Sequence, residues 1–460
     1  MKGAILSSIA LGATSALAGP LQARASSTGS SSLPEVSVKG NAFFANDERF
    51  YIRGVDYQPG GSSEVADPIA DETSCTRDIK EFTKLGINTV RVYTVDNTAD
   101  HDTCMNALAE AGIYLALDVN TPKYSINRAE PATSYNDVYL QSIFATIDAF
   151  ANYSNTLLFF SGNEVVNDGP SSKAAPYVKA VTRDMRQYIG DRGYRKIPVG
   201  YSAADVDTNR LQMAEYMNCG TDDQRSDFFA FNDYSWCDPS SFTVSGWDQK
   251  VKNFTGYGIP LFLSEYGCNT NTRKFEEVSA LYNKEMTGVY SGGLVYEYSE
   301  EGSDYGLVTI SGNSITEKSD FTALQSAFAK TSNPSGDGGY NTTGGASGCP
   351  PKDSPNWDVD SDALPAMPSP AKKYLTNGAG KGPGLTGEGS QNAGTGSSGT
   401  ASAGSGSVTN TAAASGSSSS STSTSSAGAA SGIRAPDISI ASLIPFLAVV
   451  VSTFCGAVLL

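Results

Sequence analysis

The stretch Leu157–Asp168, with the sequence LLFFSGNEVVND, decides how the rest of the chain is interpreted. Its four apolar residues run directly into the polar residues SGNE, which predicts a buried strand that carries the carboxylate of Glu164 to its C-terminal end. A second stretch, Pro260–Cys268 (PLFLSEYGC), brings Glu265 to the end of another apolar run in the same way. Either glutamate alone could merely mark a solvated strand end, so the meaning of the pair depends on the pattern of the whole chain.

Strand-like runs recur along the chain, and helical patterns lie between most of them. The runs that predict strands are Phe50–Tyr57, Asn88–Thr94, Tyr114–Asn120, Leu157–Glu164, Ile197–Ser202, Phe228–Tyr234, Pro260–Tyr266 and Gly293–Ser299. The segments that predict helices are Thr76–Leu85, Asp102–Glu110, Leu140–Ala151, Pro176–Ile189, Gln212–Met217, Trp247–Phe254 and Phe275–Val289. Eight strands alternating with helices over about 250 residues predict an α/β protein with a (β/α)₈ TIM barrel, here over residues 34–330.

The chemistry of such a barrel lies at the C-terminal ends of its strands, and Glu164 and Glu265 end the predicted fourth and seventh strands. Two carboxylates at this rim are what a retaining glycosidase uses, one as acid/base and one as nucleophile. Other polar residues are expected at the same rim: Tyr57, Gln58, Arg91, Tyr93, Asp118, Asn120, Asn232, Tyr234, Tyr296 and Tyr298. Such a ring offers hydrogen bonds and stacking to sugars, although core packing is an equal alternative for any one tyrosine.

Composition excludes several other functions. The formal net charge is −16 and the pI about 4.6, which argues against a nucleic-acid partner because a phosphate backbone would be repelled. The single histidine, His101, lies in the polar stretch ADHDTC and is expected at the surface near a helix start. One histidine cannot build a histidine-based zinc cluster and argues against a Ser-His-Asp triad. The chemistry of paired carboxylates calls for neither a metal nor an organic cofactor.

Both ends of the chain resemble processing signals. Residues 1–18 combine Lys2, an apolar run and a small-residue cleavage signature, and are predicted to be a signal peptide. Residues 433–460 end in an apolar tail, Ile438–Leu460, that small residues and a short polar spacer precede. This order predicts a GPI-anchor signal that is removed, with a true membrane span as the alternative. The mature protein is then expected as a monomer on the outer leaflet of the plasma membrane, or in the cell wall.

The cysteines and sequons fit the secretory route. Of the seven cysteines, Cys455 lies in the tail that would be removed, which leaves six and allows three disulfides. Glycosylation is predicted at the sequons of Asn152, Asn253 and Asn341.

The sequence pattern weakens after the barrel. Residues 331–376 predict an irregular extension that contains Cys349, and residues 377–432, almost wholly Ser, Gly, Ala and Thr, predict a flexible stalk that cannot bury a core.

Four motifs are specific enough to identify a family. The chain resembles the fungal β-1,3-glucanosyltransferases of glycoside hydrolase family 72 from about residue 34 to 349, in the subgroup without the C-terminal cysteine-rich carbohydrate-binding module. The motifs are GVDYQPG at 54–60, RVY at 91–93, SGNEVVN at 161–167 and SEYGC at 264–268.

The resemblance implies roles for individual residues. It implies that Glu164 is the acid/base and Glu265 the nucleophile. It implies that the sugar subsites are lined by Tyr93, Asn120, Tyr124, Ser125, Arg128, Asn163, Asp205, Arg210, Tyr234 and Tyr296. It also suggests the disulfide pairs Cys75–Cys104, Cys219–Cys349 and Cys237–Cys268.

The implied function is a retaining transglycosylase. It would cleave an internal β-1,3-glucan linkage and transfer the new reducing end to another β-1,3-glucan chain, so both partners are glucans. A plain endo-β-1,3-glucanase would use the same carboxylates, and only the resemblance favours transfer. A wall adhesin without catalysis would need no paired glutamates.

Overall fold

The computed structural model of the protein describes residues 33–61, 65–360 and 364–406. The predicted signal peptide, the predicted anchor signal and the part of the predicted stalk beyond residue 406 lie outside these residues. Within them, no helix is both long and apolar enough to span a membrane.

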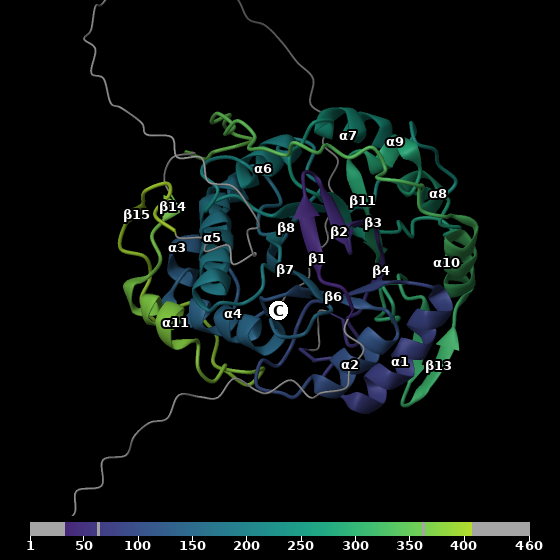
Figure 1. The fold of residues 1–460 in the computed structure, drawn as a ribbon, viewed down its shortest axis with the longest axis horizontal. Coiled ribbons are helices and arrows are strands. Elements are labelled where there is room, and N and C mark those ends of the chain that lie inside the picture. The colour runs from purple at the N-terminus through teal and green to yellow at the C-terminus, as the bar shows by residue number, and fades with distance from the viewer. Residues whose placement is uncertain (1–32, 62–64, 361–363, 407–460) are drawn as a thin grey trace, which may run out of the picture. The chain divides into compact units, whose positions relative to one another are not determined.

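Eight parallel strands close into a barrel in the order β4-β5-β6-β7-β8-β9-β10-β11, which confirms the predicted TIM barrel (Figure 1). The strands are β4 (Ile52–Asp56), β5 (Thr89–Val92), β6 (Tyr114–Asp118), β7 (Thr156–Asn163), β8 (Val199–Ala204), β9 (Phe228–Asp233), β10 (Leu261–Tyr266) and β11 (Tyr290–Val295). The eighth strand ends four residues earlier than predicted. Beyond Val295 there is no regular ladder, because the N–H groups of Tyr296 and Tyr298 bond to carbonyls on opposite sides, those of Tyr266 and Asp56.

Helices surround the barrel, and their ends follow from local sequence. They are α1 (Glu72–Leu85), α2 (Asp102–Glu110), α3 (Pro131–Ser134), α4 (Asp137–Phe150), α5 (Ala175–Asp191), α6 (Arg210–Met217), α7 (Trp247–Phe254), α8 (Glu277–Leu281), α9 (Lys284–Thr287), α10 (Ser319–Lys330) and α11 (Lys372–Asn377), with 3₁₀ turns at Pro170–Ala174 and Ser369–Ala371. The side chain of Asp71 caps α1, and Gly86 ends it in the left-handed conformation. The predicted helix Phe275–Val289 is wrong as a single element, because Asn283 accepts two backbone hydrogen bonds and starts α9 after α8 has ended.

A small antiparallel sheet that the sequence analysis did not predict precedes the barrel. It consists of β1 (Val36–Lys39), β2 (Ala42–Ala45) and β3 (Glu48–Phe50). Phe43 of β2 packs its ring against Phe228 and Phe262, near the first residues of β9 and β10. The sheet therefore closes the N-terminal end of the barrel and leaves the C-terminal end free for a site. Figure 1 shows β1 and β2 lying across the barrel.

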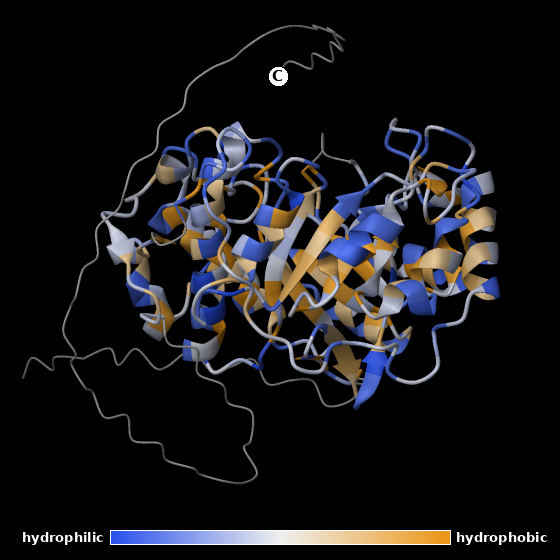
Figure 2. Cartoon of the chain, turned by 90° about the horizontal axis from the view of Figure 1, so that it is seen from above, coloured by the Kyte–Doolittle hydropathy of each residue, from blue (hydrophilic) through white to orange (hydrophobic). Residues whose placement is uncertain are grey.

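Apolar side chains fill the barrel and the layer between strands and helices. In Figure 2 the barrel strands are mostly coloured as hydrophobic, and the helices around them alternate between hydrophobic and hydrophilic residues. His101 is an exception to the sequence analysis, which expected it at the surface. It is 2% exposed because its ring packs against Phe150 and its Nε2 atom lies 2.7 Å from the Asp67 carboxylate.

Three disulfides are present and join the cysteines as the resemblance implies. Cys75–Cys104 connects α1 and α2, and Cys237–Cys268 connects the segments that follow β9 and β10. Cys219–Cys349 joins residues 130 positions apart and ties the irregular extension back to the barrel. A hairpin of β12 (Val308–Ser311) and β13 (Ser314–Glu317) precedes α10 on the opposite flank from α11.

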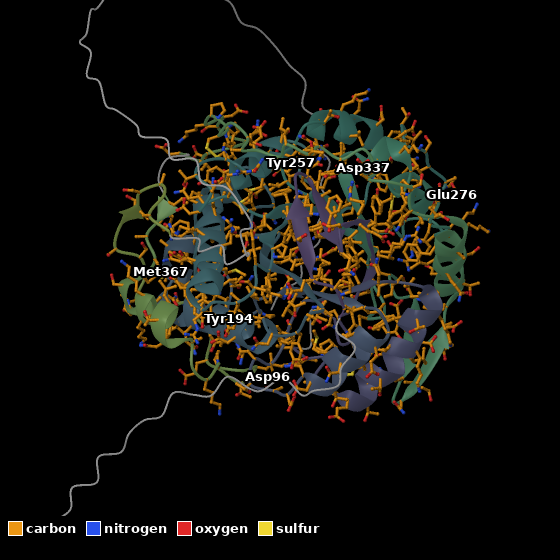
Figure 3. All side chains as sticks on the ribbon, in the orientation of Figure 1. Asp96, Tyr194, Tyr257, Glu276, Asp337 and Met367 are labelled. Atoms are coloured by element: carbon orange, nitrogen blue, oxygen red, sulfur yellow. A yellow bond between two sulfur atoms is a disulfide. The ribbon has the colours of Figure 1, made fainter. Side chains whose placement is uncertain are left out.

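The prediction of a stalk from residue 377 is wrong for residues 378–406, which we call the strap. The strap lies against α4, α5 and the loops beside them, and β15 (Thr400–Ala401) pairs with β14 (Leu364–Pro365) (Figure 1). In Figure 3, Tyr194 and Met367 mark this side of the molecule, and Glu276 marks the opposite side. The segment needs no apolar core of its own, because hydrogen bonds hold it and its glycines let the backbone approach its neighbours closely.

Candidate active site

Glu164 follows the last residue of β7 in a backbone conformation that few non-glycine residues adopt. Its φ angle is +47°, and its N–H group donates to the Ser202 carbonyl at 2.9 Å. Its carbonyl accepts a hydrogen bond of 2.7 Å from Arg128, and its Oε1 atom accepts one of 2.9 Å from Asn232. The surrounding structure thus fixes a strained residue whose carboxylate is half-buried and receives one donor from β9.

Glu265 on β10 is more deeply placed and more heavily bonded. Its side chain is 7% exposed. The Tyr234 hydroxyl donates to Oε2 at 2.6 Å, the Tyr93 hydroxyl donates to Oε1 at 2.8 Å, and Arg91 Nη1 approaches Oε1 at 3.3 Å. Burial raises the pKa of Glu265 and the nearby Glu164 adds to this, whereas Arg91 and the two tyrosines act in the opposite direction.

Among the residues that the structure describes, Arg91 is the cation that lies within the group of buried carboxyls Asp56, Asp118 and Glu265. It is fully buried, donates to both oxygens of Asp118, and packs its guanidinium over the rings of Tyr93 and Phe160. Complete burial raises the pKa of Asp56 well above its ordinary value, and the charge of Glu265 raises it further. One positive charge cannot neutralise three buried carboxylates, so burial and the neighbouring charge of Glu265 favour the neutral form of Asp56.

A network of Asn and Ser side chains extends from Glu164 below the rim, and Arg91 links it to Glu265. Asn232 Nδ2 donates both to Glu164 and to Asn163 Oδ1, and the Asn163 oxygen also accepts from Arg91. The hydroxyls of Ser202 and Ser264 bond to each other and to Asn232 Oδ1. Because its oxygen is occupied, the Asn163 amide presents its N–H₂ group as the remaining partner for a ligand.

Two cavities flank the glutamates. The first, of about 310 Å³, lies over the ends of β5, β6 and β7. It is lined by Gln58, Tyr93, Thr94, Asp118, Asn120, Thr121, Pro122, Ser125, Ile126, Arg128, Ser161, Gly162, Asn163 and Val165. The side-chain oxygen Oδ1 of Asn120 accepts a hydrogen bond of 2.6 Å from the Tyr139 hydroxyl, while its Nδ2 atom has no partner among the described residues. A buried donor without a partner on a cavity wall is suited to a ligand hydroxyl.

The second cavity, of about 580 Å³, lies over β8, β9 and α7. It is lined by Asp205, Asp207, Arg210, Asn232, Tyr234, Ser235, Ser245, Gly246, Gln249, Lys250 and Asn253. Asp205 is held by an ion pair with Arg210 and by Lys250 Nζ at 2.6 Å, and Lys250 also bonds Asp233. The walls of the second cavity therefore carry positively and negatively charged side chains that ion pairs hold in fixed positions.

Aromatic rings stand beside Glu265, but fewer of them than predicted. The rings of Tyr234, Tyr296 and Tyr305 contact one another at centroid distances of 5.3–6.3 Å. Tyr266, which belongs to the SEYGC motif, is 1% exposed and packs inside the protein, so it does not join this group. The predicted rim residues Tyr57 and Tyr298 are also in the core, where both hydroxyls donate to Asp78.

Tyr124 does not line the cavity, although the resemblance implies a sugar contact. Its side chain is 3% exposed, and its hydroxyl accepts a hydrogen bond of 3.2 Å from the Gly389 N–H group in the strap. The structure therefore assigns Tyr124 to the contact between the Asn120–Arg128 loop and the strap.

Eight of the ten implied sugar-binding residues thus line the two cavities beside the glutamates, and a ninth, Tyr296, packs against Tyr234. The sequence analysis expected Arg91, Asp118 and Asn232 at the rim but assigned them no role, and it missed Ser202, Ser264, Asp56 and Tyr305. The sequence signal that could have identified such residues is their position, since Arg91, Ser202 and Asn232 lie near the C-terminal ends of barrel strands. In the described ranges, no cluster of three His, Cys, Asp or Glu side chains has the arrangement of a metal site.

The arrangement supports acid/base and nucleophilic chemistry on a polar, uncharged ligand. The carboxylate of Glu265 is buried and held by three donors, whereas that of Glu164 is less buried and receives one donor. Cavities on both sides offer amides, hydroxyls and aromatic faces, which suits a chain of sugars that runs across the glutamates.

Comparison with known proteins gives the same picture. The glucanosyltransferase family, glycoside hydrolase family 72, matches residues 25–332. A 1,3-beta-glucanosyltransferase of Aspergillus fumigatus, gel1, is 74% identical over 385 residues, which cover 84% of each chain. The 1,3-beta-glucanosyltransferase GAS5 of Saccharomyces cerevisiae is 55% identical over 363 residues, which cover 78% of this chain and 75% of the relative.

Solved structures extend the likeness to the fold. A Saccharomyces cerevisiae Gas2p mutant in complex with laminaritetraose and laminaripentaose is 40% identical, with a TM-score of 0.69 over 74% of this chain and 76% of that one. Gas2 in complex with a small compound has the same identity and TM-score, over 74% of this chain and 78% of its own.

Proposed function

The chain belongs to the fungal glucanosyltransferases of glycoside hydrolase family 72, and we propose that it works by a two-step retaining mechanism with Glu265 as nucleophile and Glu164 as acid/base. It cleaves an internal β-1,3-glucan linkage and transfers the new reducing end to another β-1,3-glucan, so that one product grows. The observation that carries the assignment of roles is the unequal bonding of the two carboxylates.

In the first step, a Glu265 oxygen attacks the anomeric carbon of an internal glucose. The bond between that carbon and the bridging oxygen breaks, and protonated Glu164 gives its proton to the departing oxygen. The fragment on the reducing-end side leaves, and a covalent glycosyl-enzyme remains. Arg91 and the two tyrosine hydroxyls keep Glu265 ionised and correctly oriented until it attacks.

In the second step, Glu164 is a carboxylate and removes a proton from a hydroxyl of the acceptor glucan. The acceptor oxygen attacks the anomeric carbon, Glu265 is released, and the configuration of the original linkage is restored. The amide N–H₂ group of Asn163 is suited to the 2-hydroxyl of the reacting sugar, a contact that strengthens in the transition state.

We also propose that the two cavities hold glucan on the two sides of the bond that breaks. Asn120, Ser125 and Arg128 would serve one side, and Asp205 and Arg210 the other. Fixed amides and paired charges fit a neutral, hydroxyl-rich chain better than an ionic ligand.

Product analysis tests the reaction directly. Purified protein is incubated with one long, reduced laminari-oligosaccharide, and the product sizes are measured. Transfer gives products longer than the starting sugar together with short fragments. If only shorter products appear, even at high substrate concentration, the protein is an endo-glucanase. Glu265→Gln and Glu164→Gln should each abolish the reaction.

The location of the protein is a separate proposal. We propose a monomer that reaches the cell surface by the secretory route and is attached there by a GPI anchor, which its three disulfides and the order of its terminal segments support. A phosphatidylinositol-specific phospholipase should release it from membranes. Recovery from the mature protein of a peptide that contains Phe446 would show that the tail is retained. Gel filtration tests the monomer, and mass spectrometry tests glycans at Asn152, Asn253 and Asn341.

A further inference from the structure

The Asn120–Arg128 loop has two sides with different tasks. Its inner side supplies Asn120, Ser125 and Arg128 to the wall of the first cavity. Arg128 also donates to the Glu164 carbonyl at 2.7 Å, so the loop touches the backbone of the proposed acid/base. The position of this loop therefore affects how the first cavity contacts a bound glucan.

The outer side of the loop is held by the strap. Lys123 Nζ donates to the Leu385 and Gly387 carbonyls at 3.3 and 3.0 Å, and the Lys123 carbonyl accepts from the Ser390 N–H group at 2.9 Å. Gln391 Nε2 donates to the Ser125 carbonyl at 2.9 Å. Because Ser125 also lines the cavity, one residue separates the strap from the ligand space.

The strap is itself anchored close to these contacts. Ser390 is fully buried, and its carbonyl accepts from Asn136 at 2.7 Å. The side chain of Asn136 also caps α4, and the backbone of the next residue, Asp137, bonds to Thr395. The strap thus joins the loop to the start of a barrel helix rather than lying loosely on the surface.

We propose that the strap determines how tightly the first cavity binds glucan, with Gln391 and Gly387 as positioning residues that act through Ser125 and Tyr124. The inference rests on the proposed function, because it assumes that this cavity holds sugar units. A loop that is already ordered loses less conformational entropy when a sugar binds, so the strap increases affinity without touching the reacting atoms.

Gly387 offers a sharp test because a side chain cannot fit there. A Cβ atom at this position would lie 2.1 Å from the hydroxyl oxygen of the buried Tyr124 and 2.8 Å from Pro383 Cβ. Gly399 in the same strap is the matched control, since a Cβ atom there would meet no atom within 4 Å and the backbone is not left-handed. Gly387→Ala should push the strap off the loop, and Gly399→Ala should not.

Each substitution is made in the full-length protein and assayed with reduced laminari-oligosaccharides. We expect Gly387→Ala to raise KM about tenfold and to leave kcat within twofold of wild type. This combination indicates the loss of a binding interaction that is equally strong in the ground state and in the transition state. Laminaripentaose should bind about tenfold more weakly to E164Q/G387A than to E164Q/G399A in calorimetry. Amide hydrogen exchange in residues 120–128 should be faster in Gly387→Ala only.

Gln391→Ala keeps the test decisive if Gly387→Ala does not fold, because it removes only the contact to Ser125. It should raise KM severalfold, and Gln391→Glu, which lacks the donor, should behave similarly. Equal KM values and affinities in the Gly387, Gln391 and Gly399 variants would overturn the proposal, as would a change in kcat alone. Failure of the proposed function looks different, since wild type would then form no elongated product and bind no laminaripentaose.

Discussion

Tyr234 is the only residue of the described chain whose hydrogen bond reaches Oε2 of Glu265. Replacing it by phenylalanine removes the hydroxyl and keeps the ring, which packs against Tyr296 and Tyr305. A buried carboxylate oxygen is then left without a donor. The ionised form of Glu265 loses stabilisation, so its pKa rises, and the nucleophile is protonated over a wider acidic range.

The structure also gives the size of the effect and an internal comparison. A hydrogen bond to a charged group contributes about 1.5–3 kcal/mol, which corresponds to about 1–2 pH units. Tyr93→Phe also removes one donor to Glu265, but Arg91 still approaches the same oxygen, Oε1, at 3.3 Å. The shift for Tyr93→Phe should therefore be smaller than the shift for Tyr234→Phe.

The assay is kcat/KM against pH for cleavage of a reduced laminari-oligosaccharide, because this ratio reports ionisations of the free enzyme. We expect the acidic limb to move to higher pH by about 1–2 units in Tyr234→Phe, and the rate at the optimum to fall by about 10- to 100-fold. An unmoved acidic limb, or a larger shift in Tyr93→Phe, would refute the view that these donors hold Glu265 ionised.

Three further predictions follow from buried groups. Burial raises the pKa of Glu277 to about 8. Between about pH 4.5 and pH 8 the folded state therefore keeps a proton that the unfolded state has released. The stability that Glu277 contributes is fully present below this range and falls by about 1.4 kcal/mol per pH unit as the pH rises towards 8. Glu277→Gln should flatten that part of a plot of unfolding free energy against pH, and an unchanged slope would contradict the assignment. Removing the Cys219–Cys349 bridge by two serine substitutions should lower the free energy of unfolding by about 4–5 kcal/mol, measured with denaturant, while a loss under 1 kcal/mol would mean that the bridge constrains little. Asp56→Asn should keep kcat within a few-fold of wild type, because a protonated carboxyl and an amide are alike there, whereas a loss of 100-fold or more would mean that Asp56 is ionised.

The barrel could be predicted because its strands are continuous apolar runs that end in polar residues. Leu157–Phe160 and the residues after Pro260 are buried on both faces, so burial alone determines their composition. The same runs brought Glu164 and Glu265 to one rim. The order of strands around the barrel then follows from chain order, since each parallel strand pairs with the next.

Features that depend on hydrogen bonds between distant segments could not be predicted in this way. The strap is poor in apolar residues and rich in Gly and Ser, so its sequence does not predict a packed segment, and the hydrogen bonds that hold it come from distant residues such as Asn136 and Tyr124. Tyrosines gave the opposite difficulty. Tyr266 and Tyr298 are large enough to fill the core and polar enough to lie at the rim, and the sequence does not specify which of the two positions they occupy.

Glu164 is held from two directions, and this bears on why a sugar rather than water completes the reaction. Its carboxylate is bonded by Asn232 from the barrel, whereas its carbonyl is bonded by Arg128 from the loop that the strap holds. The Glu164 carboxylate alone is enough to remove a proton from the incoming molecule in the second step, and it can act on water as well as on a sugar hydroxyl. A glucan acceptor also needs walls that position its rings, and a tenfold preference over water requires only about 1.4 kcal/mol of barrier difference. The barrel strands position both glutamates, and we therefore expect the loops at the rim to influence the balance between transfer and hydrolysis. Changes in those loops should alter that balance while the first step of the reaction continues.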